Sequence, residues 1–83
     1  MNKKYTTTRA VALRIAELLA QQNISQYELA KRSLLTDSTI SSIMNEVNDS
    51  CKLRIVERIS DGFGISISQF FDSPYFDHDN FNN

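Results

Sequence analysis

The sequence contains very few of the residues that usually shape loops or form cross-links. Its 83 residues include one cysteine, one proline, two glycines and no tryptophan. Because Cys51 is alone, no disulfide can form within the chain, which suits a reducing cytoplasm. The scarcity of glycine and proline, together with frequent helix-capping residues, predicts an all-α fold in one small domain.

The sequence also lacks the patterns of membrane segments and of common catalytic or metal sites. No apolar stretch is long enough for a signal peptide or a membrane span, so we expect a cytoplasmic protein. There is no glycine-rich phosphate loop and no zinc-ligand spacing. His78 lies between Asp77 and Asp79, and adjacent residues do not converge on a metal. We therefore expect no enzyme activity, no metal and no cofactor.

Charge is unevenly distributed, although the net charge is only −1 and the isoelectric point is near 5.7. All nine basic residues lie in residues 1–58, beside six acidic ones, so that part carries +3. Residues 59–83 hold four acidic residues and no basic one, a charge of −4. Such a distribution is compatible with DNA binding on one side of the domain, with a modest salt-dependent contribution from phosphate contacts.

Residues 25–45 are the most informative stretch, and we interpret them as two short helices joined by a tight turn. Ser25 is a helix cap, and Glu28 stands where it can complete a capping box. Thr36 caps the second helix, followed by an acidic residue in its first turn. The apolar positions Leu29 and Ile40 are expected to pack the two helices together.

The outward face of the second helix is short-chained, polar and nearly uncharged. It consists of Asp37, Ser38, Ser41, Ser42 and Asn45. Such side chains can enter a major groove and hydrogen-bond to base edges. For an isolated helix, a solvated surface is the commoner explanation, so the interpretation depends on the two-helix context.

The remaining chain divides into further helices and two terminal segments. Residues 1–7 are expected to form a flexible arm, 8–72 the domain and 73–83 an acidic, aromatic tail. Helix 8–22 would be capped by Thr7 or Thr8 and ended by Asn23, with Arg14 on its polar face. Helix 51–63 would point Leu53, Val56, Ile59 and Phe63 inward and stop at Gly64. Gly62 is an unusual residue inside a helix, and the alternative is that the helix ends there. Ser66 with Gln69 forms a capping box for a last helix.

Together these residues resemble the helix-turn-helix of Cro/CI-type (XRE-like) bacterial and phage regulators. The positions that carry the resemblance are Ser25-Gln26, Glu28-Leu29-Ala30, Thr36 to Ile40, Ile43, Leu53, Val56, Ile59, Phe63-Gly64-Ile65-Ser66 and Phe70-Phe71-Asp72. The resemblance implies a compact five-helix, lambda-repressor-like domain whose second and third helices form the motif. Two positions depart from the family pattern, since Leu34 and Glu46 stand where members often have glycine. A left-handed Leu34 would cost about 1 kcal/mol, so either the turn differs or packing of Leu34 compensates.

The resemblance also implies a function and a set of site residues. It implies sequence-specific binding of double-stranded DNA by a small transcriptional regulator, a repressor that acts as a homodimer on a palindromic operator. Asp37, Ser38 and Ser42 match the main base-reading positions, and Ser41 and Asn45 are secondary. The expected phosphate contacts are Gln26, Thr36, Thr39, Lys31, Arg32 and Lys52.

Two other functions stay open at this point. The same fold could serve as the antitoxin of a toxin–antitoxin pair, with the acidic, aromatic segment 72–83 contacting the partner protein. The aromatic residues of that segment, Tyr75, Phe76 and Phe81, could instead pack back on the domain or form a subunit contact. It could also be an interaction module that has lost DNA binding, which the acidic isoelectric point and Asp37 would favour.

Overall fold

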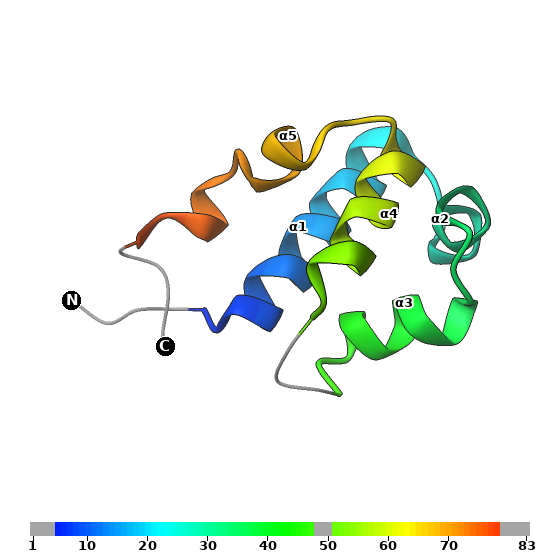
Figure 1. The fold of residues 1–83 in the computed structure, drawn as a ribbon, viewed down its shortest axis with the longest axis horizontal. Coiled ribbons are helices and arrows are strands. Elements are labelled where there is room, and N and C mark those ends of the chain that lie inside the picture. The colour runs from blue at the N-terminus through cyan, green and yellow to red at the C-terminus, as the bar shows by residue number, and fades with distance from the viewer. Residues whose placement is uncertain (1–4, 48–50, 79–83) are drawn as a thin grey trace.

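A computed structural model describes residues 5–47 and 51–78 of the chain (Figure 1). This part contains five α-helices and one short 3-10 helix, in agreement with the predicted five-helix, all-α fold. The elements are α1 (Thr7–Gln22), α2 (Gln26–Ser33), α3 (Asp37–Met44), α4 (Leu53–Phe63), α5 (Ile67–Phe71) and η1 (Pro74–Phe76). Helices α1 and α4 lie side by side, with α2 and α3 on one side and α5 and η1 on the other.

Capping side chains explain most of the helix starts. The hydroxyl groups of Ser25 and Thr36 each accept a hydrogen bond from the backbone N–H three residues later. The full capping box predicted for Ser66 and Gln69 is present. The box predicted at Ser25 is only half formed, because the Glu28 carboxylate accepts from Arg32 Nε at 3.1 Å instead. This i,i+4 ion pair competes for the carboxylate that would otherwise reach back to the helix start.

The start of α1 differs from the prediction by one or two residues. Thr6, not Thr7 or Thr8, is the cap, and its hydroxyl accepts from the backbone N–H of Arg9. Thr8 cannot take that role because its position lies inside the helix and its side chain is buried. Asn23 ends α1 in the left-handed conformation, as predicted.

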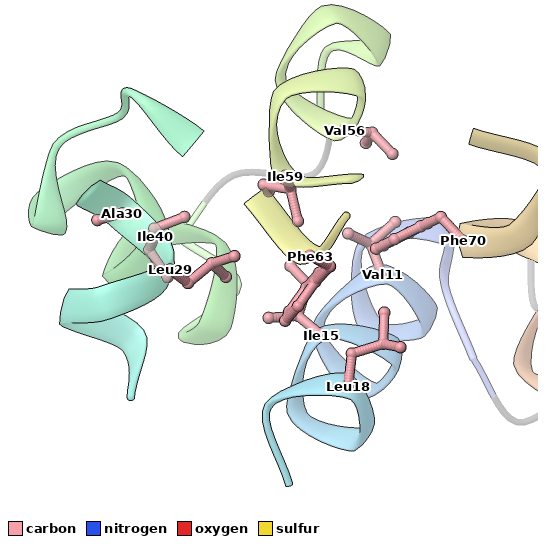
Figure 2. Close-up of a cluster of buried hydrophobic side chains, with 10 residues drawn as sticks. All are labelled: Val11, Ile15, Leu18, Leu29, Ala30, Ile40, Val56, Ile59, Phe63 and Phe70. Carbon is pink, nitrogen blue, oxygen red and sulfur yellow. The ribbon is translucent and has the colours of Figure 1, made fainter. Parts of the chain in front are cut away.

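The hydrophobic core joins the helix pair α2–α3 to α1, α4 and α5 (Figure 2). Its buried members are Val11, Ile15, Leu18, Leu29, Ala30, Ile40, Val56, Ile59, Phe63 and Phe70. The inward positions predicted for α4 are confirmed for Val56, Ile59 and Phe63. Leu53 was wrongly predicted to point inward and is 62% exposed. As the first residue of α4 it stands before the stretch that packs on the core, while Ile55 is half-buried against it.

Gly62 marks the place where α2 and α4 approach most closely. A Cβ atom added at Gly62 would lie 2.2 Å from Ser33 Oγ and 3.2 Å from the Ser33 backbone nitrogen. The suggestion that α4 ends at Gly62 is therefore wrong, since the helix continues to Phe63. Glycine is tolerated inside this helix because only a residue without a side chain fits against α2.

The C-terminal segment packs back onto α1. The Phe76 ring lies 4.8 Å from the Phe71 ring and 6.1 Å from the Phe70 ring, centroid to centroid, and packs against the core. Tyr75 makes an edge contact with Tyr5 at 5.6 Å. The folded body therefore extends beyond residue 72, where we expected the tail to begin. Phe81, which we grouped with these aromatic residues, lies outside the described residues.

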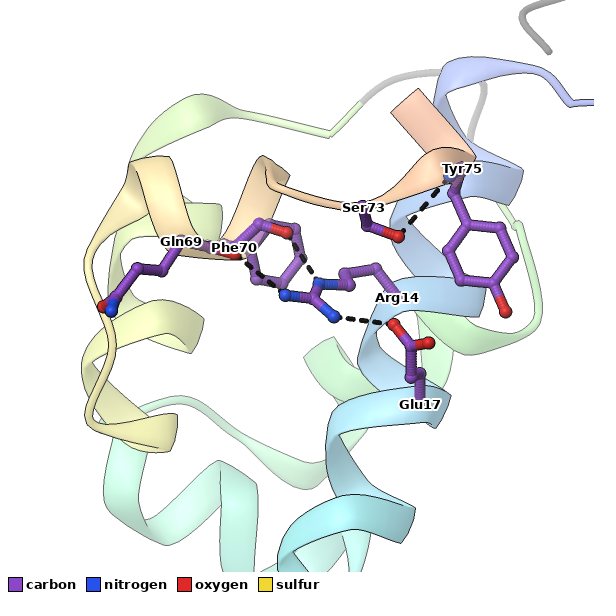
Figure 3. Close-up of polar contacts among 6 residues, drawn as sticks. All are labelled: Arg14, Glu17, Gln69, Phe70, Ser73 and Tyr75. Carbon is purple, nitrogen blue, oxygen red and sulfur yellow. Dashed lines mark hydrogen bonds and ion pairs between the residues drawn. The ribbon is translucent and has the colours of Figure 1, made fainter. Parts of the chain in front are cut away.

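Arg14 fastens this segment to α1 (Figure 3). Its guanidinium donates to the carbonyl oxygens of Phe70 at 2.7 Å and Gln69 at 2.8 Å, and pairs with Glu17 at 2.6 Å. The Arg14 side chain is only 11% exposed, so this residue of the predicted polar face is largely buried. The arginine gives the Phe70 carbonyl oxygen at the end of α5 a donor, and gives that of Gln69 a second donor beside the Asp72 backbone N–H at 3.3 Å.

The turn between α2 and α3 keeps the left-handed geometry without glycine. Leu34 has φ 57° and ψ 37°, and Glu46, after α3, has φ 54°. Neither explanation offered for Leu34 holds, because the turn is left-handed and the side chain is 81% exposed. The chain therefore bears a backbone cost at Leu34 that side-chain burial does not offset.

We expect Gly62→Ala to lower the free energy of unfolding by about 1–3 kcal/mol, because overpacking at Ser33 outweighs the higher helix propensity of alanine. Chemical denaturation measures the change. Ser33→Ala is the matched partner, since the Ser33 hydroxyl is buried and has no hydrogen-bond partner among the described residues. That substitution alone should be nearly neutral, and it should reduce the penalty of Gly62→Ala. An equal penalty in both backgrounds would contradict the proposed clash.

We expect Leu34→Gly to raise the free energy of unfolding by roughly 0.5–1 kcal/mol, because glycine adopts positive φ without a steric cost. Leu34→Ala is the control, since it removes the exposed side chain but keeps the Cβ atom. The alanine variant should stay within about 0.5 kcal/mol of the wild type in the same denaturation experiment. Equal stabilisation by both substitutions would assign the effect to the leucine side chain rather than to the backbone.

Candidate nucleic-acid interface

Helix α3 is anchored along one side and open along the other. Ile40 is fully buried, and Ile43 and Met44 are half-buried against the core. The helix begins after Thr36, whose hydroxyl accepts from the Thr39 backbone N–H at 3.1 Å. This anchoring leaves the opposite side of α3 exposed, at the edge of the molecule in Figure 1.

The predicted base-reading residues lie on this open side to different degrees. Asp37, Ser38 and Asn45 are exposed, whereas Ser41 and Ser42 are half-buried. Asn45 Nδ2 donates to Ser41 Oγ at 3.2 Å, so these two side chains already share one hydrogen bond. The exposed residues nearest the start of α3 are therefore Asp37 and Ser38.

The predicted phosphate-binding residues are distributed over α2, the first turn of α3 and the start of α4. Gln26 is exposed at the first position of α2, and Lys52 is exposed at the cap position of α4. The hydroxyl groups of Thr36 and Thr39 lie 2.8 Å apart and hydrogen-bond to each other. This pair stiffens the start of α3 while leaving Thr36 exposed.

The two cations at the end of α2 are already engaged with neighbours. Glu28 pairs with Arg32 at 3.1 Å and stands 4.0 Å from Lys31 Nζ. Lys31 Nζ also lies 5.6 Å from the centre of the exposed Tyr27 ring. Tyr27 had no assigned role, although its helical spacing from Lys31 was visible in the sequence.

A second ion pair near α3 joins residues that are far apart in the sequence. Arg9 Nη1, in the first turn of α1, lies 2.7 Å from Glu46 Oε2, just after α3. We had noted Glu46 only as a departure from a glycine position. Nothing in the sequence reveals this pair, because 37 residues separate the two side chains.

The described residues also include side chains of the types that bind metal ions or act as nucleophiles. Within residues 5–47 and 51–78, no three His, Cys, Asp or Glu side chains are grouped so that they could hold a metal ion. Burial raises the pKa of the Cys51 thiol, which leaves less of the nucleophilic thiolate at neutral pH. None of the described helices is long and apolar enough to span a membrane.

Solved structures of other proteins share the fold of this chain. The wild-type restriction-modification controller protein C.Esp1396I is 25% identical, with a TM-score of 0.72 over 78% of this chain and 82% of that chain. The prophage Lp1 protein 11 is also 25% identical, with a TM-score of 0.78 over 88% of this chain and 96% of that one. Comparison with curated proteins found no match.

A family model provides the assignment. The model for HTH_3, described as helix-turn-helix, matches residues 15–70, which include α2, α3 and α4 entirely. This range contains the positions on which the Cro/CI-type resemblance was based, except Phe71 and Asp72. The chain therefore belongs to the XRE-type helix-turn-helix family HTH_3, a family of DNA-binding transcription regulators.

Proposed function

We propose that this protein is a repressor that binds a palindromic operator as a homodimer. In each subunit α3 enters the major groove with its N-terminal end toward the bases, while α2 crosses the phosphate backbone. The two-fold axis of the dimer matches that of the operator, with half-sites about one helical turn apart. The controller and prophage proteins that share the fold support a bacterial or phage-type regulator.

The single observation that carries this proposal is that α3 packs on the core along one side and is exposed along the other. Ile40 is buried completely, whereas Asp37 and Ser38 are exposed at the capped start of the helix. The exposed Gln26 at the start of α2 supplies a hydrogen-bond donor for a phosphate of the bound DNA. A helix packed in this way can reach base edges without any rearrangement of the core.

Asp37 gives the proposed reading face a distinctive chemistry. A carboxylate can accept a hydrogen bond from the amino group of cytosine, and it repels phosphate. Serine hydroxyl groups donate or accept according to the base that they face. We therefore expect an operator with cytosine at the position read by Asp37, and a site whose recognition depends more on hydrogen bonds than on charge.

The antitoxin alternative loses part of its support. It was based on exposed aromatic side chains in the tail, but Tyr75 and Phe76 are half-buried and contact Tyr5, Phe70 and Phe71. The module without DNA binding keeps its two supports, the acidic isoelectric point and Asp37, which is exposed on the α3 face.

The test is selection from a pool of randomised duplex DNA at two salt concentrations, followed by sequencing of the bound fraction. We expect an enriched palindrome whose affinity falls as salt rises. Sedimentation of the complex gives the number of subunits on each duplex, which should be two. Absence of any enriched sequence at low salt would reject the proposed function.

We expect Ser42→Ala to weaken binding to the selected palindrome by about 1–3 kcal/mol per half-site, through the loss of a base contact. Fluorescence anisotropy with the palindrome and a scrambled duplex measures the change, and binding to the scrambled duplex should stay the same. Ser68→Ala is the control, because Ser68 is an exposed serine on α5, away from α3. An equal effect of the two substitutions would remove Ser42 from the base-reading residues.

A further inference from the structure

Three basic side chains on the segments that flank α3 form ion pairs with two carboxylates. Glu28 binds Arg32 at 3.1 Å and stands 4.0 Å from Lys31, all within α2. Glu46 binds Arg9 at 2.7 Å, which links the end of α3 to the start of α1. These five side chains together carry a net charge of only +1, although three of them are basic.

The two carboxylates lie on the two segments that flank α3. Glu28 is in the first turn of α2, the helix that leads into the N-terminal end of α3, and Glu46 directly follows Asn45 at the C-terminal end. Figure 1 shows α2 next to the N-terminal end of α3 and the start of α1 near its other end. A duplex laid along α3 would therefore have one ion-paired group on the helix that precedes α3 and another directly after α3.

The ion pairs are exposed enough to exchange partners. The side chains of Arg9, Lys31 and Arg32 are 54%, 60% and 48% exposed, and those of Glu28 and Glu46 are 38% and 31% exposed. Pairs in such surroundings are held only weakly. A DNA phosphate can therefore replace the carboxylate as the partner of each cation, but the negative charge of the glutamate stays beside the phosphate.

We propose that Glu28 and Glu46 limit the sequence-independent affinity of this protein for DNA by neutralising the cations on the two segments that flank α3. This inference rests on the proposed DNA-binding function of α3. Because non-specific binding depends almost entirely on charge, the neutralisation leaves recognition to the hydrogen bonds that α3 makes with the bases. Glu28 and Glu46 thereby act as affinity-limiting residues, although neither needs to touch a base.

The expected size of the effect follows from counterion release. Removing one carboxylate frees one net positive charge for a phosphate, which steepens the slope of log K against log salt by about 0.9. The same change should strengthen binding roughly three- to tenfold at about 0.1 M salt. The gain should be similar for operator and random duplexes, because phosphate contacts carry no sequence information.

The test compares Glu28→Gln and Glu46→Gln with Asp72→Asn in the full chain. All three variants remove one negative charge, but Asp72 is exposed after α5, on the side of α1 and α4 away from α3. Anisotropy titrations with a scrambled duplex and with the selected palindrome, at several salt concentrations, give the affinities and slopes. Circular dichroism establishes that each variant is folded.

We expect both glutamate variants to bind the scrambled duplex more tightly and with steeper slopes, while Asp72→Asn resembles the wild type. Equal behaviour of the three variants would assign the effect to net charge and overturn the inference. Wild-type binding with unchanged slopes in the glutamate variants would also overturn it, and would leave the proposed function intact. If no protein bound either duplex at low salt, the proposed function would fall and this inference with it.

A double-variant comparison tests whether Glu46 acts through Arg9. Arg9→Gln should weaken binding, because it leaves the Glu46 carboxylate without its partner, whereas the double variant Arg9→Gln/Glu46→Gln should bind like the wild type, because both carry no net charge at this pair. A double variant that bound as tightly as Glu46→Gln alone would show that the gain does not require Arg9, and would overturn the neutralisation mechanism at that end of α3.

Discussion

The close crossing of α2 and α4 at Gly62 is the constraint on which the rest of the molecule depends. The added Cβ atom that would clash with Ser33 shows how little space separates the two helices. This crossing fixes α2 on the core, and α2 in turn fixes the position of α3 through the short turn at Leu34. Leu29 and Ile40, both fully buried, complete the junction. The open side of α3 is therefore a consequence of packing on its opposite side, since a helix with one anchored face must present the other to solvent.

Backbone conformation around α3 is set by position rather than by residue type. Leu34 and Glu46 adopt left-handed conformations that glycine would occupy without strain. Both residues flank α3, the helix proposed to contact DNA. The chain therefore bears a backbone cost at the two turns that set the direction of α3. At Glu46 the side chain has a second role, because its carboxylate reaches Arg9 across the end of the helix. Glu46 thus both turns the backbone after α3 and forms an ion pair with α1.

The charge near the proposed interface differs from the average charge of the chain. The acidic isoelectric point counts against DNA binding only when charge is averaged over the whole chain. In the structure the cations around α3 occur in small groups with acidic partners, while Arg14 is used on the other side of α1 to fasten the C-terminal segment. A regulator built in this way depends on hydrogen bonds along α3 for recognition and on dimerisation for affinity, which is the arrangement proposed above.

The sequence by itself determined the helical fold class, the two short helices of the motif, most of the caps and the buried positions Leu29, Ile40, Val56 and Ile59. These features are local, because caps and helical periodicity involve residues within a few positions of each other. Tertiary structure alone decided the role of Gly62, the burial of Arg14, the packing of Phe76 and the Arg9–Glu46 pair. Each of these joins segments that are distant in the chain, and one sequence carries no signal for which distant side chains will meet. At the candidate site, the exposure of Asp37 and Ser38 follows from the helical periodicity around Ile40, which is local, whereas the half-burial of Ser41 and Ser42 depends on the segments packed beside α3.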